Sequence, residues 1–329
     1  MKIGIAGAGL VGRLLAWHLK QHGCEVALFS KDGMAAEHSC SAMAAGMISP
    51  MAELPILPTA WHAMAQDALT WWPKILTSLS LPVYYQARGS IVLSHSKDKS
   101  LLMHFIAAIG KNIAPLMGSE LHTLESELNP ALCGCYLPHE AHIDAGQLMQ
   151  ALGGNLTHPY HVVNKLTSKS IETNKGTFYF DKIIDCRGLG SDFPGLRGVR
   201  GELIYCHAPH VHIQRPLRLL HARFPCYIVP RQNHHYIIGA TQIESEATDP
   251  ISVKSTLQLL SAATSVHSGF YDANIIHMKT GCRPTSLNHV PFILERKGVT
   301  HVNGMFRHGF LLAPSLLAQL AQNLVNNES

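Results

Sequence analysis

A glycine-rich turn directly behind an apolar segment constrains the fold of this chain more than any other feature. The run Lys2-Ile3-Gly4-Ile5-Ala6 is typical of a buried strand, and the G-x-G-x-x-G sequence Gly7-Ala8-Gly9-Leu10-Val11-Gly12 follows it at once. In such a turn the first glycine permits the tight bend, the second lets the backbone approach a pyrophosphate, and the third lets the next helix pack on the strand. That helix directs its N-terminus at the phosphates. Gly23 is expected to end the helix, and a second strand follows over residues 25–29, so the sequence predicts a βαβ dinucleotide-binding unit.

The end of the second strand departs from this fingerprint. An acidic residue is expected there, about twenty positions after the turn, to bind ribose hydroxyls. The chain has Ser30, Lys31 and Asp32 instead. Ser30 or Asp32 could make a weaker ribose contact, Ser30 and Lys31 could receive the 2′-phosphate of NADP, or Lys31 could belong to a solvated turn. The sequence leaves these three interpretations open.

A run of small residues over 39–50 follows, with the sequence Ser-Cys-Ser-Ala-Met-Ala-Ala-Gly-Met-Ile-Ser-Pro. A segment without long polar side chains can bring its backbone against a flat aromatic ligand. A flavin enzyme needs such a segment, whereas a nicotinamide enzyme does not. The alternative is the start of a tightly packed helix.

Composition excludes several classes of protein. The 329 residues carry 26 Lys and Arg against 22 Asp and Glu, a net charge of +4 without a basic block, so no nucleic-acid partner is expected. No apolar run is long enough to span a bilayer, and no secretory leader precedes the first strand, so we expect a soluble, cytoplasmic protein. The 8 cysteines contain no Cys-x-x-Cys pair, and Cys133 and Cys135 are expected to be small buried or turn residues.

The 22 histidines raise the question of a metal. His207, His210 and His212 are the densest group, and on a strand His210 and His212 would face the same side, as metal ligands can. We predict no metal site and expect these side chains to face solvent. His234 and His235 are expected in a hairpin turn.

Hydrophobic periodicity gives a coarse order of elements. Helices are predicted over 60–80, 100–110 and 144–152, a strand over 86–93, and short strands with turn signals over 160–186 and 199–241. Strands and helices then close the chain, without an internal repeat or a linker.

Several motifs together resemble the D-amino-acid-oxidase-like flavoprotein superfamily, and within it most closely the glycine oxidases of thiamine biosynthesis. They are the glycine turn, the 41–47 segment, Val199-Arg-Gly-Glu202, Cys226-Tyr-Ile-Val-Pro-Arg231 with Ile238-Gly-Ala-Thr241, Gly281-Cys-Arg-Pro-Thr285, and Asn303-Gly-Met-Phe-Arg-His-Gly-Phe-Leu-Leu-Ala-Pro314. The resemblance covers nearly the whole chain. It implies an α/β fold (α+β overall), in which a Rossmann-like FAD-binding domain carries an inserted, mainly antiparallel substrate-binding sheet domain. The implied division is 1–80, 141–198 and 276–329 for FAD, and 81–140 and 199–275 for substrate.

The resemblance also implies a set of FAD-binding residues. They are Gly7, Ala8, Gly9, Leu10, Val11, Gly12, Ser30, Lys31, Ser41, Ala45, Gly46, Met47, Val163, Gly188, His308, Gly309, Phe310 and Leu311. Val163 matches the position that packs on adenine. Arg187 departs from the small residue usual before Gly188, and it could be exposed or contact a phosphate.

Three residues are implied for the chemistry. Arg283 would hold the substrate carboxylate bidentately, Tyr227 would donate a hydroxyl hydrogen bond to it, and Arg307 would lie near the flavin edge. From sequence alone Arg283 could equally be a loop arginine and Tyr227 a core residue. The strand-to-helix turn 304–314 would stabilise negative charge on the flavin.

The implied activity is oxidation of a small primary or secondary amino acid, with O2 as acceptor and hydrogen peroxide as product. No acid or base is evident, because Asn288-His289 stands where related enzymes often have an aspartate. Four alternatives remain: a D-amino-acid dehydrogenase with another electron acceptor, an oxidase of a modified tRNA base, an NADP-linked dehydrogenase, and a non-catalytic flavin-binding protein. The identity of the amino acid and the oligomeric state, a homo-oligomer included, are left open.

Overall fold

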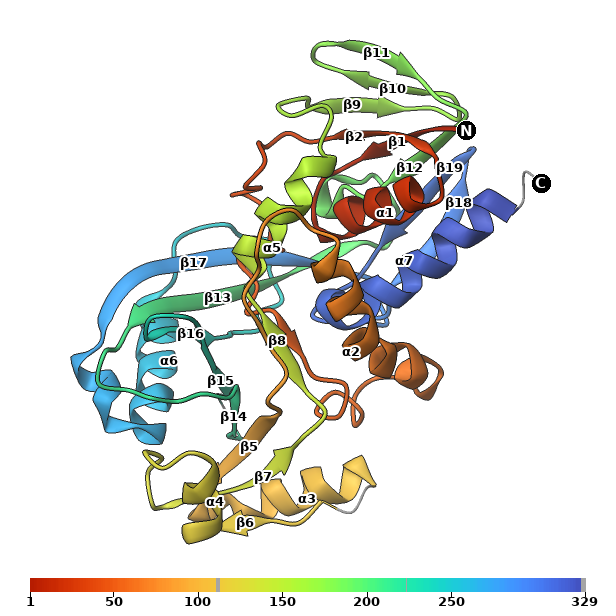
Figure 1. Cartoon of the computed structure of the whole chain (residues 1–329). Coiled ribbons are helices and arrows are strands. Elements are labelled where there is room, and N and C mark those ends of the chain that lie inside the picture. Colours follow the sequence, from red (N-terminus) through yellow and green to blue (C-terminus); the bar gives the residue numbers. More distant parts are fainter. Residues whose placement is uncertain (111–112, 223, 327–329) are drawn as a thin grey trace.

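The protein consists of two sheet-based parts that lie side by side, as a computed structural model shows (Figure 1). The structure describes residues 1–110, 113–222 and 224–326. In Figure 1 the part that contains both ends of the chain lies at the upper right, and a larger sheet lies at the lower left. The chain passes between the two parts repeatedly, as expected for an inserted domain.

The first part is built on a five-stranded sheet of order β18-β19-β12-β1-β2. The strands are β1 (Lys2–Ala6), β2 (Glu25–Phe29), β12 (Lys182–Asp185), β18 (Phe292–Arg296) and β19 (Val299–Asn303). All neighbours are parallel except β18 and β19. Buried parallel strands are continuously apolar, which is why these short runs were recognisable in the sequence. The predicted βαβ unit and the Rossmann-like architecture are therefore confirmed.

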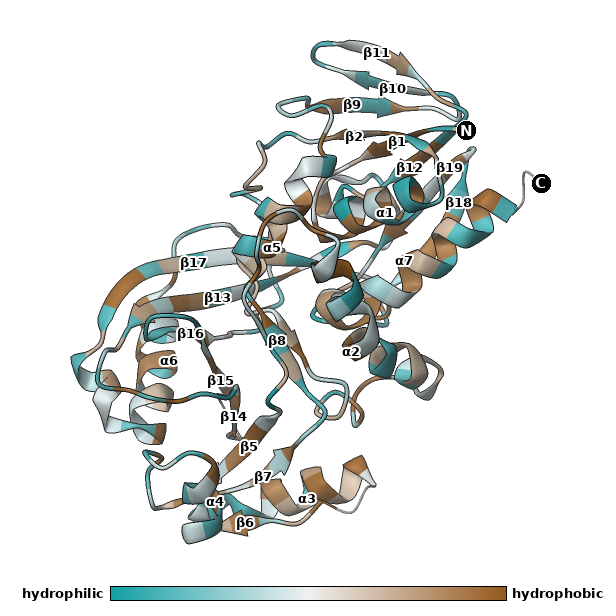
Figure 2. Cartoon of the chain, viewed as in Figure 1, coloured by the Kyte–Doolittle hydropathy of each residue, from teal (hydrophilic) through white to brown (hydrophobic). Residues whose placement is uncertain are grey.

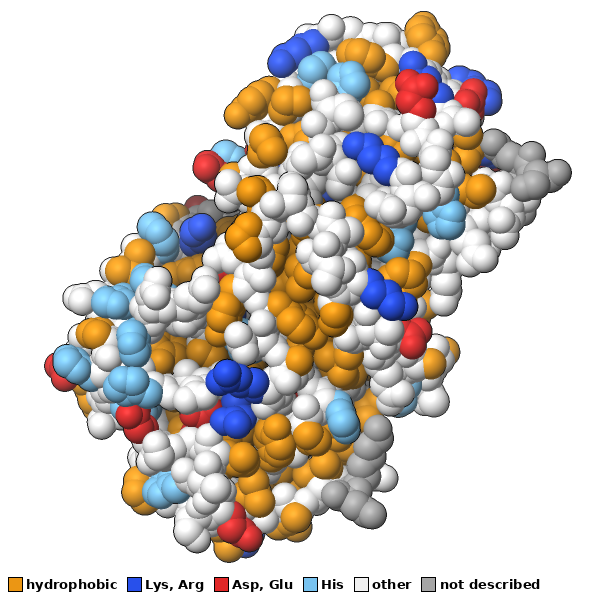
Figure 3. All heavy atoms as spheres, viewed as in Figure 1, with side chains coloured by type: hydrophobic (Ala, Val, Ile, Leu, Met, Phe, Trp, Pro, Cys, Tyr) orange, Lys and Arg blue, Asp and Glu red, His pale blue; other side chains and the backbone are white. Residues whose placement is uncertain are grey.

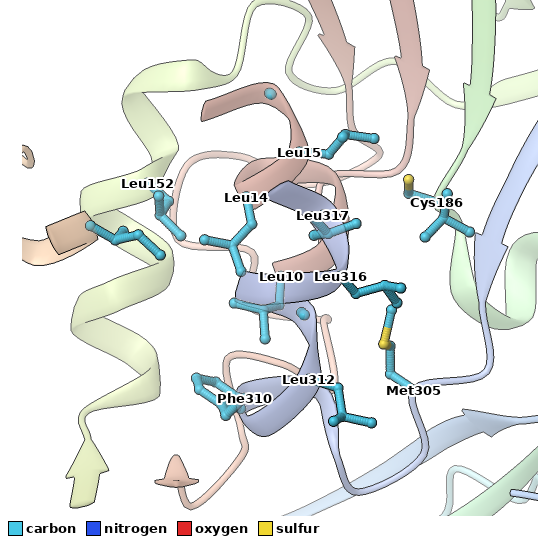
Figure 4. Close-up of a cluster of buried hydrophobic side chains, with 14 of the residues drawn as sticks. Leu10, Leu14, Leu15, Leu152, Cys186, Met305, Phe310, Leu312, Leu316 and Leu317 are labelled. Carbon is cyan, nitrogen blue, oxygen red and sulfur yellow. The ribbon is translucent and has the colours of Figure 1, made fainter. Parts of the chain in front are cut away.

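Helices and small sheets cover this first sheet. The helices are α1 (Leu10–Gln21), α2 (His62–Thr77), α5 (Ala145–Leu152) and α7 (Gly309–Asn326). A three-stranded sheet comprises β9 (Val163–Leu166), β10 (Ser170–Thr173) and β11 (Gly176–Tyr179), and another comprises β3 (Met47–Ile48), β4 (Tyr85–Gln86) and β8 (Ala141–Ile143). Figure 4 shows part of the apolar core to which α1 contributes Leu10 and Leu14 and α7 contributes Leu316 and Leu317.

A buried arginine ties three segments of this part together. Arg13 is 0% exposed, and its guanidinium donates to the carbonyl oxygens of Ala8 (2.7 Å), Met34 (2.6 Å), Met149 (2.5 Å) and Gly33 (3.2 Å). Burial lowers the pKa of Arg13 to about 10, so it stays charged at neutral pH. The carbonyl oxygens solvate the buried guanidinium in place of water.

The second part is an eight-stranded sheet of order β17-β13-β16-β15-β14-β5-β7-β6. Its strands are β5 (Ser90–His95), β6 (Leu116–Met117), β7 (Leu132–Leu137), β13 (Arg197–His207), β14 (Leu217–Leu220), β15 (Cys226–Pro230), β16 (His235–Gly239) and β17 (Asn274–Thr285). Only β14 and β5 pair in parallel, so the prediction of a mainly antiparallel sheet is confirmed. Helices α3 (Lys99–Ile109), α4 (Ser119–Leu124) and α6 (Val253–Val266) pack on this sheet. Strands β5 and β7 contain mostly hydrophobic residues (Figure 2).

Two details differ from the sequence-based expectation. The strand expected over 86–93 is two strands, because Gly89 at φ +74° breaks it between β4 and β5. Strand β17 pairs with β13 up to Thr285, although the predicted division assigns everything from residue 276 to the FAD part. The division remains a proposal, and within it β17 belongs with the larger sheet.

Three further expectations concern the cysteines, membrane-spanning helices and the distribution of basic side chains. Cys133 and Cys135 are buried in β7. Among the described residues no helix has both the length and the apolar character to cross a membrane. On the face in Figure 3 the Lys and Arg side chains are scattered, and several histidines gather along the left edge.

Candidate active site

A cavity of about 1440 Å³ lies between the two sheets. Ligand pockets usually measure roughly 300–1000 Å³, so this one has room for a large cofactor together with a small substrate. The glycine turn and the end of β2 line one end, and strands β14, β15 and β17 line the other. We call these the cofactor end and the substrate end.

The backbone shapes the cofactor end. Gly7 has φ +99°, and a Cβ on Gly12 would lie 1.9 Å from the carbonyl oxygen of Gly7, so helix α1 packs against the turn only without a side chain there. Helix α1 starts without a side-chain cap and without an acid in its first turn. Such a helix start attracts a pyrophosphate, so these residues fit the phosphates of a dinucleotide.

The residues after β2 occupy the same end. Ser30 is buried and its Oγ accepts from the backbone N–H of Asp32 at 3.0 Å, while Lys31 is exposed. Asp32 and Glu53 are the carboxylates that line the cavity within the described part of the chain. Asp32 therefore brings an acid to the cofactor end of the cavity. Val163, the first residue of β9, also lines this end.

The segment 39–50 forms turns that lead into β3, not the start of a helix. Gly46 has φ +60°, and a Cβ on it would lie 2.0 Å from the carbonyl oxygen of Ile143. The larger sheet holds this segment: Tyr205 donates to the carbonyl oxygen of Met43 at 2.6 Å, and Arg231 donates to that of Ala45 at 2.6 Å. Ser41, Ala45, Gly46 and Met47 all line the cavity, as a wall against a flat ring requires.

Two further turns reach the cavity from the sheet ends. After β12, Arg187 forms an ion pair with the buried Asp185 at 2.9 Å, so it is neither a freely exposed arginine nor an unpaired one. Gly188 follows at φ +58°, and both residues line the cavity. After β19, the chain turns into α7, whose first residues also line it: Gly309, Phe310 and Leu311.

His308 stands immediately before α7 and is buried. Burial is the main cause that lowers its pKa to about 4, so the ring is neutral at pH 7. Its Nδ1 lies 3.5 Å from a carboxylate oxygen of Glu53. The positive charge at this end of the cavity therefore comes from the N-terminus of α7 and from arginines, not from His308.

The two residues predicted to hold the substrate carboxylate, Arg283 and Tyr227, lie at the substrate end. Arg283 on β17 lies over Gly201, where a Cβ would be 2.3 Å from its Nη2. It donates to the carbonyl oxygen of Thr241 at 3.3 Å, its one hydrogen bond to the described residues, which leaves other N–H groups free. Tyr227 on β15 also lines the cavity, and burial raises its pKa against the opposing effect of Arg283. Both side chains meet at one end of the cavity, as a shared carboxylate would require.

Glu53, a buried carboxylate that was not predicted as a site residue, holds two arginines in place at this end. Glu53 accepts hydrogen bonds from Arg218 Nη1 at 2.8 Å and from Arg307 Nε at 3.1 Å. Arg307 Nη2 also forms an ion pair with it at 3.0 Å. Burial alone would raise the pKa of Glu53, but Arg218 and Arg307 outweigh it and lower the pKa to about 2. Glu53 is therefore ionised, and it links the 49–57 turns to the larger sheet and to the loop before α7.

Arg218 was missed as well, although a signal was present. It interrupts the apolar run of β14, and a charge in an otherwise buried strand is rarely placed there without a partner. Glu53 gave a weaker signal because it lies in a turn.

His210 and His212 are exposed, as predicted, but they do not lie on a strand. Strand β13 ends at His207, so His210 and His212 follow it in irregular structure and do not share a strand face. His212 instead bonds to Glu127 at 2.8 Å through Nδ1. Among the described residues no three His, Cys, Asp or Glu side chains are grouped as metal ligands. His234 lies in the hairpin turn between β15 and β16, and His235 begins β16.

A glycine turn that fits phosphates and an arginine-lined pocket at opposite ends of one cavity are the arrangement expected of a flavoprotein oxidoreductase. The comparison with protein families agrees: residues 2–322 match the model described as DAO, FAD dependent oxidoreductase. The chain belongs to this family, and FAD is its cofactor.

Individual relatives cover the whole chain. It is 32% identical over 337 residues to a protein named as a thiamine biosynthesis oxidoreductase, ThiO, of Rhizobium etli, covering 100% of this chain and 98% of that one. It is 26% identical to a glycine oxidase of Geobacillus kaustophilus, covering 99% and 93%.

Solved structures share the fold. The crystal structure of glycine oxidase from Geobacillus kaustophilus superposes with a TM-score of 0.85 at 24% identity, covering 99% of this chain and 94% of that one. An iminodiacetate oxidase from Chelativorans sp. BNC1 superposes with a TM-score of 0.82 at 20% identity, covering 99% and 95%.

Proposed function

We propose that the protein oxidises the Cα–N bond of a small amino acid, glycine being the simplest candidate. The observation that carries this proposal is the meeting of Arg283 and Tyr227 at one end of a cavity whose other end fits a dinucleotide. Bound FAD supplies the acceptor for a hydride from Cα, and its reoxidation by O2 yields hydrogen peroxide. The substrate is left as an imino acid, which water converts to an oxo acid and ammonia.

Arg283 and Tyr227 orient the substrate in this scheme. A guanidinium holds a carboxylate through two parallel hydrogen bonds, and the Tyr227 hydroxyl adds a third donor. A carboxylate held in this way fixes the direction of the Cα–H bond, so the bound substrate is already oriented for reaction. The roles of both residues rest on their position and on the family resemblance.

The substrate amine reacts in its neutral form. Glu53 is the carboxylate nearest to the arginines of the substrate end, but it is ionised with a pKa of about 2 and accepts from two guanidinium groups. Such a group is a poor base at neutral pH. The amine proton is therefore lost to water on binding, with the Arg283 and Arg218 charges favouring the neutral amine.

Arg307 and the start of α7 favour negative charge at the flavin edge. Helix N-termini stabilise anions, and α7 has no acid in its first turn. Glu53 fixes Arg307 through both Nε and Nη2, so the cation keeps its place without reorganisation. The predicted contacts of His308, Gly309, Phe310 and Leu311 belong to this same turn.

The wider context is part of the proposal. The names of the relatives support a place in thiamine biosynthesis and a small amino acid as substrate. A contribution to thiazole synthesis, O2 as electron acceptor and a cytoplasmic location complete the proposal. A homo-oligomer is compatible with this scheme. The second candidate is a D-amino-acid dehydrogenase, which would use the same clamp and pass electrons to an acceptor other than O2.

A spectrum of the purified protein tests the proposal. The protein should be yellow, and glycine, sarcosine or D-alanine added without air should bleach the flavin. Admission of air should restore the colour and release peroxide. A yellow protein that no amine bleaches would refute the amine oxidation, and bleaching without peroxide release would establish the dehydrogenase.

A further inference from the structure

Two arginines of the larger sheet present free donors to the cavity, although an amino acid such as glycine has one carboxylate. Arg283 is the predicted clamp. Arg218 is the second, and it lines the same cavity on the other side of Tyr227. Arg307 differs from both because Glu53 occupies its Nε and Nη2.

The sheet register places Arg218 beside the clamp. Arg218 on β14 is the direct antiparallel partner of Tyr227 on β15. Paired residues point to the same face, and neighbouring strands lie about 4.8 Å apart. Arg218 is therefore one strand further from Arg283 than Tyr227 is. A group held by Arg218 would lie beyond the carboxylate that Arg283 and Tyr227 share.

Arg218 lacks acceptors for most of its N–H groups. Its Nη1 donates to Glu53 Oε1 at 2.8 Å, and this is its one hydrogen bond to the described residues. Its Nε is buried without any partner. The nearby Glu140 does not supply the missing acceptor, because its oxygens accept from Ser90 Oγ and from the backbone N–H of Ala52.

A partly buried guanidinium with one acceptor for its five N–H groups indicates a ligand. The Arg218 side chain is 22% exposed, and a buried N–H without an acceptor is costly. The other arginines around the cavity show what satisfies such a group, since Arg187 and Arg307 each hold a carboxylate through Nε and Nη2. A carboxylate brought by the substrate would supply an acceptor for the N–H groups of Arg218 that reach the cavity.

We propose that Arg218 is a specificity-determining residue that binds the second acidic group of a dicarboxylic amino acid. Arg283 and Tyr227 hold the α-carboxylate of this substrate, so the inference rests on the proposed function and narrows its substrate class. The second carboxylate can be carried by the nitrogen or by the side chain, since either reaches one strand beyond Tyr227. Glycine would then be accepted without engaging Arg218.

Binding of unreactive acids tests this without turnover. Acetate, malonate, succinate and glutarate are titrated into the FAD-loaded protein, and dissociation constants are taken from the change in flavin absorption. The dicarboxylate of matching length should bind at least about tenfold more tightly than acetate, as a charge-assisted hydrogen bond requires. Equal affinity for acetate and all three dicarboxylates would overturn the proposal.

Three variants locate the effect. Arg218→Met should reduce the ratio of dicarboxylate to acetate affinity to about one, with acetate affinity unchanged. Arg218→Lys keeps the charge without the planar fork and should lose most of the ratio, which carries the test if the Met variant does not hold FAD. Lys254→Met is the control, because Lys254 lines the cavity from α6 as an exposed cation, and it should leave the ratio unchanged. An equal loss for acetate and dicarboxylates in Arg218→Met would refute a specific role.

Turnover separates the two forms of the substrate. Iminodiacetate carries the second carboxylate on nitrogen, and D-aspartate carries it on the side chain. One of them should have a higher kcat/KM than glycine in the wild-type protein, and this advantage should vanish in Arg218→Met. If glycine is oxidised but neither diacid is preferred, the inference fails while the proposed function stands. If no amine bleaches the flavin, the proposed function fails, and the binding titration still reports on Arg218.

Discussion

The two ends of the cavity are built by different means. The cofactor end consists mostly of backbone: glycines at 7, 12 and 46, the start of α1 and the turns after β2 and β12. The substrate end consists of charged and hydroxyl side chains, namely Arg218, Tyr227 and Arg283, with Glu53 behind them. At the cofactor end an added side-chain atom would disturb the packing or the cofactor. At the substrate end the loss of a charged side chain would weaken substrate binding. Substitutions at the two ends should therefore fail in different ways.

The largest effect is expected where a side chain is added at the cofactor end. Gly12→Ala places a Cβ 1.9 Å from the Gly7 carbonyl oxygen, so α1 must shift from the turn. Overpacking against a backbone oxygen costs more than about 3 kcal/mol, and the purified variant should be colourless. FAD content by absorbance and the urea midpoint of the apoprotein measure both effects.

Gly9→Ala separates packing from cofactor contact. Its Cβ would meet only Ser39 Oγ at 3.5 Å and Ser41 Oγ at 3.7 Å, so the apoprotein should keep its stability while FAD affinity falls. Gly154→Ala, with no atom within 4 Å of the new Cβ, is the neutral control. Full FAD occupancy in Gly12→Ala would contradict the account of this end.

At the substrate end the largest loss is expected from Arg283→Leu. Without the bidentate clamp the KM for an amino acid should rise at least about 100-fold, since such a contact is worth several kcal/mol. FAD content should stay normal, in contrast to Gly12→Ala. Exposed Arg296→Leu on β18 serves as the control. An unchanged KM in steady-state peroxide assays would show that another group holds the carboxylate.

Glu53→Gln tests the connection behind the substrate end. Loss of the carboxylate leaves Arg218 and Arg307 without their shared partner, and breaking a buried pair costs about 3 kcal/mol. The folded pKa of about 2 is below the ordinary 4.5, so this stabilisation is complete above pH 4.5 and disappears as the pH falls through 2. Urea unfolding at pH 7 and at pH 3 should show a large difference from the wild type at the first and a smaller one at the second.

Glu53→Asp controls for the charge alone. It should recover part of the stability and part of the kcat lost in Glu53→Gln. A difference between wild type and Glu53→Gln that grows on acidification would contradict an ionised Glu53.

The smallest effect is expected outside both ends, at His142 on β8. This ring is 0% exposed, and burial lowers its pKa to about 3. The unfolded chain takes up the proton first as the pH falls below 6.5, so stability is lost from there down towards pH 3. His142→Phe should match the wild type at pH 8 and exceed it by about 2 kcal/mol at pH 5 in urea unfolding. Exposed His210→Phe should show no such pH dependence.

The sequence predicted the cofactor end far better than the substrate end. The glycine turn, β1 and α1 are contiguous, and each glycine is required by a contact within a few residues, so local pattern is enough. Arg218 and Glu53 are 165 positions apart and become partners only through the sheet register and the turns after β3. No spacing rule connects them.

The ends of two strands could not be predicted from the local sequence pattern. Alternation placed His210 and His212 on one strand face, but β13 stops at His207, where its pairing with β16 and β17 ends. The length of β17 could not be read either, because its pairing with β13 is set by a partner about 80 positions earlier in the chain.

The interleaved path of the chain has a consequence for how the protein acquires its cofactor. The cavity walls come from residues near both ends of the sequence and from the larger sheet between them, so a partly folded chain has no complete pocket. FAD therefore binds the native state alone, and at a concentration 100 times its dissociation constant it adds about 2.7 kcal/mol to the stability of that state. FAD binding and folding are therefore coupled equilibria, and the supply of FAD affects the folding yield. With FAD in excess, the yellow colour of a wild-type preparation then reports the fraction of chains that have folded to completion.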